Sequence, residues 1–161
     1  MSDLIRVLKT RAGWMGYGME GPAVDRVYLP HASSEELMRK YGIEDGNGGG
    51  LRILDELLSD YFSGREADFS QVQVKLPGAT EFQKKVYEAA SSIPYGETRT
   101  YGWVAESIGV PHASRAVGSA LKANPIPLIV PCHRVLASDG LGGFTPSLEL
   151  KKKLLKLEGR L

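Results

Sequence analysis

The residues of this chain best suited to covalent chemistry are Cys132 and His133, which stand side by side. A thiolate is a strong nucleophile, and a neighbouring imidazole can accept the thiol proton directly or through water. A carboxylate often orients such an imidazole, and the C-terminal region offers three whose spacing does not choose among them: Asp139, Glu149 and Glu158. The pair predicts a reactive thiol, although a lone cysteine beside an apolar run is also typical of a small buried core residue.

Cys132 is the only cysteine among the 161 residues, and the chain has three histidines. One cysteine cannot form an internal disulfide, and scattered histidines do not supply ligands at the spacing of a metal centre. We therefore expect no metal site and no cofactor, so that any chemistry at Cys132 is that of a thiol.

The charged residues are unevenly distributed along a chain whose net charge is only +1. Residues 1–77 hold 9 Lys and Arg against 12 Asp and Glu, whereas the remaining residues hold 11 against 7. The second half is therefore expected to face phosphate groups, although an imbalance of this size is also common on an ordinary solvated surface.

The distribution of apolar residues argues against a membrane protein. No segment approaches the roughly 18 uninterrupted apolar residues that a membrane span requires, and the N-terminus lacks the continuous apolar region of a signal peptide. The sequence thus predicts a cytoplasmic protein with no membrane partner. Its length and its 42% hydrophobic residues suit one ordinary domain or two small ones.

The first half of the chain predicts a small antiparallel sheet followed by a helix. Apolar runs at 4–8 and 24–29 are separated by glycines that punctuate the chain. The glycine-rich segment 42–50 predicts a surface loop. Leucines and aromatic residues in 51–62 recur at three- and four-residue spacing, which is typical of a helix.

The second half predicts helices around the Cys132 segment. Thr80 and Gln83 fit a capping box for a helix that ends at Pro94. Two short helices, 100–108 and 114–123, the second capped by Ser114, suggest a helix-turn-helix, with an ordinary helical hairpin as the alternative. An apolar, strand-like run at 126–130, the Cys132 turn, a loop at 138–146 and a last helix complete the chain.

Two of these helices have faces that bear on function. In 114–123 a small-residue face, flanked by Arg115 and Lys122, would let a nucleic-acid groove approach, although it would equally suit helix packing. Its members are Ala116, Ser119, Ala120 and Ala123. In the last helix Leu150, Leu154 and Leu157 share one face, and lysines including Lys151 surround the rest.

The segment 124–135, NPIPLIVPCHRV, closely resembles the signature of the O6-alkylguanine-DNA alkyltransferases, or methylated-DNA–protein-cysteine methyltransferases. Further motifs similar to this family's occur in its order and approximately at its spacing: TEFQKKVY (80–87), IPYGET (93–98), Tyr101, SRAVG (114–118), GGF (142–144) and LEG (157–159). The resemblance is strong over residues 78–161 and moderate over residues 51–69. Residues 1–50 resemble the family only in their general character.

The resemblance implies a DNA-repair enzyme that acts once. Cys132 is the expected acceptor of the alkyl group from O6-alkylguanine in double-stranded DNA, and activity on O4-alkylthymine is left open. His133 is the expected water-linked base, and Glu158 the carboxylate that orients it. Because an alkyl thioether is not readily hydrolysed, turnover should stop at one.

The resemblance also implies how the DNA is bound. The target atom lies inside the base stack, so family members flip the nucleotide out, and they bind through the minor groove. Arg115 is then expected to fill the space that the flipped base leaves in the stack, and Tyr101 to promote rotation of the nucleotide at its 3′ phosphate. Asn124 is expected to act as a hinge between the helix 114–123 and the active-site turn. The other expected DNA contacts are Ala116, Ser119 and Lys122, and the expected alkylguanine pocket residues are Val135, Gly143, Phe144, Thr145 and Lys151.

Two departures from the family pattern limit what can be carried over. Phe144 stands where some relatives have tyrosine, and Thr145 where some have serine, so a main-chain donor in this loop would survive but a phenol hydroxyl would not. Some relatives hold zinc in the N-terminal domain, but a chain with one cysteine cannot build such a site from Cys and His.

The sequence as a whole predicts a monomeric α/β protein in two parts. Residues 1–76 form a small antiparallel sheet with a helix, and residues 77–161 a mainly helical domain with the helix-turn-helix and the Pro-Cys-His-Arg turn. A close-fitting pocket should also be overfilled, and the fold destabilised, by alkylation of Cys132.

Three other functions stay open at this point. A non-transferring lesion-binding relative would have another residue, usually tryptophan, in place of Cys132. A helix-turn-helix regulator would need polar base-reading side chains where this helix has small ones. A thiol hydrolase would show catalytic turnover.

Overall fold

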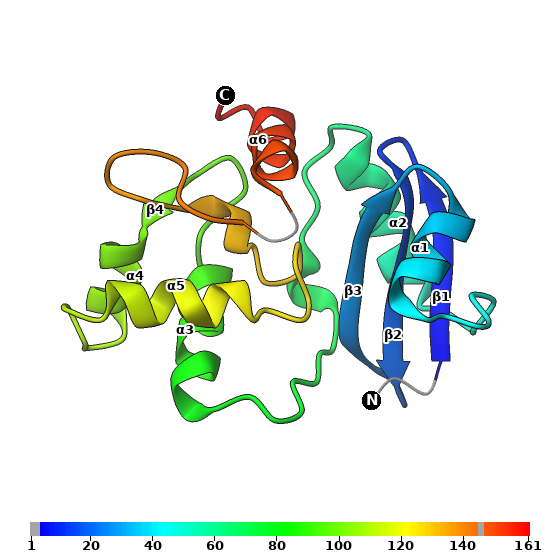
Figure 1. The fold of residues 1–161 in the computed structure, drawn as a ribbon, viewed down its shortest axis with the longest axis horizontal. Coiled ribbons are helices and arrows are strands. Elements are labelled where there is room, and N and C mark those ends of the chain that lie inside the picture. The colour runs from blue at the N-terminus through cyan, green and yellow to red at the C-terminus, as the bar shows by residue number, and fades with distance from the viewer. Residues whose placement is uncertain (1–3, 145–146) are drawn as a thin grey trace. The chain divides into compact units, whose positions relative to one another are not determined.

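The computed structural model describes residues 4–144 and 147–161. The chain divides into two compact units, Met1–Pro77 and Gly78–Leu161 (Figure 1). The first unit contains a three-stranded sheet with two helices, and the second is mainly helical. The predicted α/β class is confirmed.

The sheet of the first unit is an antiparallel meander of β1 (Leu4–Thr10), β2 (Gly13–Glu20) and β3 (Ala23–His31). The antiparallel sheet is as predicted, but glycines read as punctuation between strands lie within the central strand. A Cβ on Gly16 would come within 2.8 Å of the Arg6 carbonyl oxygen, so glycine permits the close approach of β1 and β2 there. The alternating pattern of β2 is therefore obscured in the sequence by residues that packing requires.

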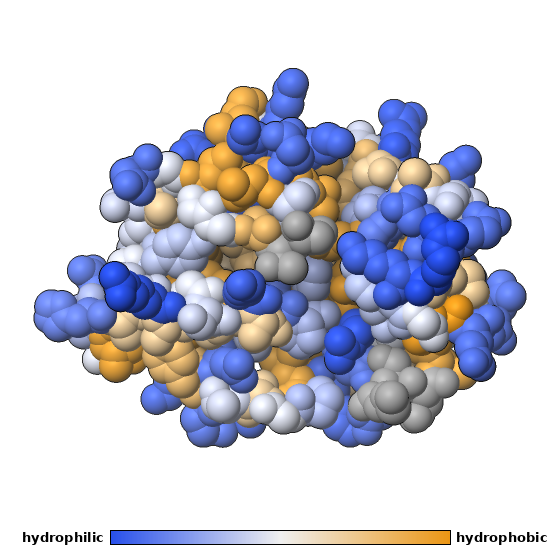
Figure 2. Space-filling view, viewed as in Figure 1, coloured by the Kyte–Doolittle hydropathy of each residue, from blue (hydrophilic) through white to orange (hydrophobic). Residues whose placement is uncertain are grey.

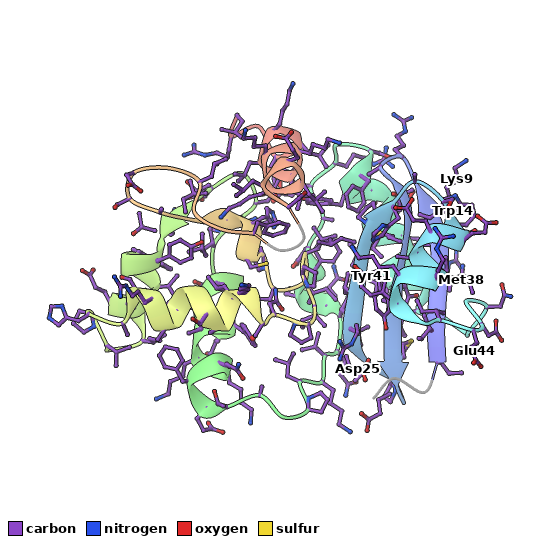
Figure 3. All side chains as sticks on the ribbon, in the orientation of Figure 1. Lys9, Trp14, Asp25, Met38, Tyr41 and Glu44 are labelled. Atoms are coloured by element: carbon purple, nitrogen blue, oxygen red, sulfur yellow. The ribbon has the colours of Figure 1, made fainter. Side chains whose placement is uncertain are left out.

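Two helices accompany this sheet, α1 (Ser34–Tyr41) and α2 (Arg52–Phe62). The sequence analysis predicted only α2. Helix α1 is capped by Ser33, which accepts from the Glu36 amide, and it ends at Gly42 in the left-handed region with φ 64°. Figure 3 labels Met38 and Tyr41 on α1, and the Tyr41 ring lies 4.7 Å from that of Tyr28 on β3.

Helix α2 is joined to the sheet by a polar cluster. The Tyr17 hydroxyl donates to Asp55 Oδ1 at 2.7 Å and accepts from the Leu51 amide at 2.9 Å, and Arg6 binds the other oxygen of Asp55 at 3.0 Å. Leu54, Leu57, Leu58, Tyr61 and Phe62 are buried, as the predicted apolar face requires. The 3₁₀ helix η1 (Phe69–Gln71) follows.

Three helices form the body of the second unit: α3 (Glu81–Ser91), α4 (Tyr101–Ser107) and α5 (Ser114–Lys122). The capping box of Thr80 and Gln83 at α3 is confirmed. The prediction that Ser114 caps α5 is wrong, because Ser114 is already helical and Ala113 is the N-cap, without a side-chain hydrogen bond. The Tyr87 hydroxyl ties α3 to α5 by donating to the Ala120 carbonyl at 2.8 Å.

The apolar run 126–130 is a tight turn, and the strand-like prediction is wrong. Pro127 and Val130 form an isolated bridge, the Val130 amide donates to the Ile126 carbonyl at 3.0 Å, and Leu128 is buried with φ 75°. Prolines at 125 and 127 remove two backbone donors that a ladder would need. The turn brings the chain back into the 3₁₀ helix η2 (Cys132–Arg134).

Two short elements complete the frame around η2. Strand β5 (Val135–Leu136) pairs in parallel with β4 (Arg99–Thr100), and α6 (Leu148–Leu157) packs on η2 (Figure 1). The buried face of α6 consists of Lys151, Leu154 and Leu155, not of the predicted Leu150, Leu154 and Leu157. Leu154 is buried and Lys152, Lys153 and Lys156 are exposed as predicted, so hydropathy failed at Lys151, the one buried lysine of this helix.

The face seen in Figure 2 mixes projecting hydrophilic side chains with apolar residues between them. Within the described residues, no helix has the length and apolar character needed to traverse a lipid bilayer.

Candidate active site

Cys132 is the first residue of η2 and lies on the wall of a cavity of about 570 Å³. Its side chain is almost buried, with 9% of the residue exposed. Described residues that line the cavity come from α4, α5, the turn after α5 and the loop at 143–144: Tyr101, Arg115, Gly118, Ser119, Leu121, Lys122, Asn124, Pro127, Cys132, Gly143 and Phe144. The thiol is thus enclosed by protein but faces a space that a small molecule or a base could enter.

Asn124 holds the turn that presents the thiol. Its side-chain Nδ2 donates to the Val130 carbonyl at 3.0 Å, and its Oδ1 accepts from the Ile126 amide at 3.0 Å. The same side chain hydrogen-bonds Cys132, which lowers the pKa of the thiol. Since Asn124 directly follows the end of α5, it links this helix to the nucleophile.

His133, Arg134 and Glu158 form a buried network beside the thiol. His133 Nε2 lies 2.5 Å from Glu158 Oε2, and Arg134 Nε donates to Glu158 Oε1 at 2.8 Å. The Gly96 amide also donates to this carboxylate, at 3.1 Å. Of the three carboxylates that the sequence offered, Glu158 is the one beside His133, whereas Asp139 and Glu149 are exposed.

The sequence analysis missed Arg134 as a site residue. Its guanidinium donates to the Ile93 carbonyl at 2.8 Å as well as to Glu158, so it joins η2 both to the end of α3 and to the end of α6. Its place in the Pro-Cys-His-Arg motif was the sequence feature that could have identified Arg134 as a site residue.

Burial governs the ionisation of this site. It raises the pKa of the Cys132 thiol, while the Asn124 hydrogen bond and the Lys151 charge act in the opposite direction. Burial also lowers the pKa of His133, against the influence of Glu158. A neutral His133 can accept a proton, which a base must be able to do.

Lys151 reaches the back of the site from α6. It is fully buried, and its ammonium donates to the Val135 carbonyl at 2.7 Å and to the Gly143 carbonyl at 3.0 Å. It also lies 5.8 Å from the centroid of the Tyr101 ring, whose hydroxyl is 3.5 Å from the same Gly143 carbonyl. The helical pattern placed this lysine on a solvated face and the family resemblance placed it at the pocket; in the structure it connects two walls of the site.

The exposed face of α5 holds most of the residues expected to contact DNA. Arg115, Ser119 and Lys122 are exposed and line the cavity, and Ala116 is exposed without lining it. Ala120, which was expected on this face, is buried with Val117 and Leu121, because these three positions share the side of the helix that packs on the domain.

The expected pocket residues are placed unevenly. Gly143 and Phe144 line the cavity, whereas Val135 is buried and presents its carbonyl to Lys151. Thr145 lies outside the described residues. The expectation that alkylation overfills the pocket is not supported, because the thiol faces about 570 Å³ of open space.

Within the described residues, no group of three His, Cys, Asp or Glu side chains is arranged to hold a metal ion.

Comparisons with known proteins place this arrangement among its relatives. A family model described as "6-O-methylguanine DNA methyltransferase, DNA binding domain" matches residues 81–160. A methylated-DNA–protein-cysteine methyltransferase of Methanosarcina acetivorans is 56% identical over 111 residues, which cover 68% of this chain and 69% of the relative. A second methylated-DNA–protein-cysteine methyltransferase, from Mycobacterium bovis, is 49% identical over 102 residues, which cover 63% of this chain and 61% of the relative.

Two solved structures are similar over nearly the whole chain. The Mycobacterium tuberculosis O6-methylguanine methyltransferase has a TM-score of 0.78 and 36% identity, covering 98% of this chain and 94% of its own. The M. tuberculosis protein OGT in complex with DNA has a TM-score of 0.79 and 34% identity, covering 96% of this chain and 91% of its own.

Proposed function

This chain belongs to the 6-O-methylguanine DNA methyltransferase family, and from that membership we propose that it repairs DNA by moving the alkyl group of O6-alkylguanine irreversibly onto Cys132. The observation that carries the proposal is the cavity beside Cys132, bordered by the exposed face of α5 and by the loop at 143–144. Its volume of about 570 Å³ is in the range of roughly 300–1,000 Å³ typical of small-molecule sites.

The reaction proceeds in one displacement. The Cys132 sulfur attacks the alkyl carbon, an S–C bond forms, and the C–O6 bond breaks with its electron pair going to the guanine oxygen. His133 takes the thiol proton through water, Glu158 orients the imidazole, and the released guanine takes up one proton. The thioether is not hydrolysed, so each chain reacts once.

The base reaches the thiol by leaving the duplex. Double-stranded DNA lies with its minor groove on α5, where Ala116 and Ser119 allow close approach and Lys122 contacts phosphate. Arg115, exposed at the beginning of α5, enters the stack, and Tyr101 crowds the backbone so that the nucleotide rotates into the cavity.

Main-chain groups hold the flipped base. Those of Cys132, Val135 and the loop at 142–145 supply donors and acceptors, with Phe144 as an apolar wall and Asn124 as the hinge between α5 and the active-site turn. All of these residues lie in one chain, and the protein acts as a monomer in the cytoplasm.

The proposal is tested by intact-protein mass spectrometry after incubation with an O6-methylguanine duplex. One added methylene mass per chain, mapped to Cys132, is expected. Continued release of product with unmodified protein would indicate a thiol hydrolase instead, and tight binding of the duplex without any mass change would indicate a non-transferring lesion-binding protein.

Replacing Glu158 by Gln should slow transfer by roughly 10²-fold without abolishing it. The amide keeps the shape of the carboxylate but cannot stabilise a protonated His133. Single-turnover rates measured against pH report the change, with melting temperature as a check because Arg134 also loses its buried partner. Glu149→Gln, an exposed position on the same helix, is the matched control. If the Glu158→Gln profile overlays that of the wild type, Glu158 has no part in the chemistry.

A further inference from the structure

Lys151 is a buried cation for which the described part of the chain supplies no carboxylate partner. Its residue exposure is 0%, and its two hydrogen bonds go to the neutral carbonyl oxygens of Val135 and Gly143. Among residues 4–144 and 147–161, no Asp or Glu lies within ion-pairing distance of its ammonium. An ammonium removed from water is unfavourable unless a nearby anion or strong acceptors compensate for the lost hydration.

The network of His133, Arg134 and Glu158 has no net positive charge. Arg134 is bound to Glu158, so these two charges balance, and burial lowers the pKa of His133 so that its imidazole is neutral. The other cations that face the cavity, Arg115 and Lys122 on α5, are exposed, and their charges are screened by solvent and salt. Lys151 is therefore the buried positive charge available to the nucleophile within the described residues.

We propose that Lys151 is a positioning residue for alkyl transfer, whose ammonium is the counter-charge of the Cys132 thiolate and whose hydrogen bonds hold the Gly143 loop against β5. This inference rests on the proposed function. Lys151 does not touch the alkyl group, and it acts through the ionisation of Cys132 and the shape of the cavity wall.

Burial raises the pKa of the Cys132 thiol, and among the described ionisable groups that interact with the thiol, Lys151 is the charged one that opposes this shift. These groups are Tyr87 from α3, Tyr101 from α4, His133 from η2 and Lys151 from α6. Burial raises the pKa values of both tyrosines, so they are neutral at pH 7. Burial lowers the pKa of Lys151 to about 8, with the Cys132 charge acting in the opposite direction, so at pH 7 most of Lys151 is protonated.

The decisive measurement is the pKa of the Cys132 thiol in the free protein, obtained from the rate of iodoacetamide alkylation against pH. The chain has one cysteine, so the reaction reports this thiol alone. Lys151→Met should lower the rate at pH 7 at least about tenfold by raising the thiol pKa by one unit or more. Lys151→Arg, which keeps the charge, should recover most of that loss. Lys153→Met, on the exposed side of α6, should match the wild type.

A folded Lys151→Met protein with the wild-type thiol pKa would overturn the proposal and leave Lys151 a structural residue. If Lys151→Met does not fold, the reciprocal effect decides: nuclear magnetic resonance of the lysine side chains should show the Lys151 pKa lower in Cys132→Ser than in wild type, and an equal value would refute the pairing. Neither measurement uses DNA. Failure to repair O6-methylguanine therefore counts against the proposed function, whereas an unchanged thiol pKa counts against this inference alone.

Discussion

The Cys132→Ala variant is expected to transfer no alkyl group while binding an O6-methylguanine duplex with a Kd within about threefold of the wild type, a difference under 1 kcal/mol. The exposed face of α5 and the loop at 143–144 are independent of the sulfur atom, and removing a nearly buried thiol leaves the cavity wall otherwise intact. Transfer is measured with a duplex carrying labelled methyl, and binding by fluorescence anisotropy at one stated salt concentration.

Cys132→Ser is the matched variant for this experiment, because it replaces the thiol by a hydroxyl of similar size at the same position. It should also fail to react, since a serine hydroxyl does not ionise as readily as a thiol. Label recovered on the Cys132→Ala protein would show that another residue is the nucleophile. Loss of duplex binding in both variants would instead make the sulfur part of lesion recognition.

The Arg115→Ala variant should repair duplex DNA about 100-fold more slowly while reacting with free O6-benzylguanine at nearly the wild-type rate. Extruding a base requires a few kcal/mol, and about 2.7 kcal/mol corresponds to a hundredfold in rate. Arg115 is exposed at the first turn of α5, on the rim of the cavity, where its loss leaves the Cys132 network untouched. The free base needs no extrusion and therefore serves as the internal reference.

Lys122→Ala separates phosphate binding from base flipping. Lys122 also lies exposed on α5 and lines the cavity, and its loss should weaken duplex binding in a salt-dependent way. At saturating concentrations its single-turnover rate should return to the wild-type value, whereas that of Arg115→Ala should stay low. Equal slowing of Arg115→Ala with duplex and free base would place Arg115 in the chemistry or the fold.

Local signals predicted much of this fold from the sequence. The capping box of Thr80 and Gln83 and the apolar spacing of α2 depend on neighbours within one or two turns, and both elements form as expected. Strand β2 was misread because its glycines are required by its contact with β1, and the turn at 126–130 because its apolar residues resemble a strand although Pro125 and Pro127 interrupt it. Gly16 meets the backbone of β1, and the buried Leu128 takes a left-handed conformation that its apolar character does not reveal.

The site shows the same division between local and distant information. Spacing could not choose among three carboxylates, and only folding brings Glu158, 25 positions along the chain, to His133. Hydropathy assigned Lys151 to the surface with the other lysines of its helix, and only the family resemblance placed it at the pocket. Its burial becomes intelligible only when the carbonyl groups of Val135 and Gly143 are seen to converge on its ammonium.

The hydrogen bonding of Lys151 to neutral carbonyl groups has a consequence for the protein after repair. When the sulfur becomes a thioether it can no longer ionise, while the buried ammonium stays, so alkylation removes the group whose charge Lys151 could balance whatever the size of the adduct. Methyl and benzyl adducts differ in volume, but both remove the same ionisable thiol. Every lesion would then leave the same chemical change at the site, and calorimetry should show a similar shift in melting temperature for both adducts. A shift that grows with adduct size would return the explanation to packing.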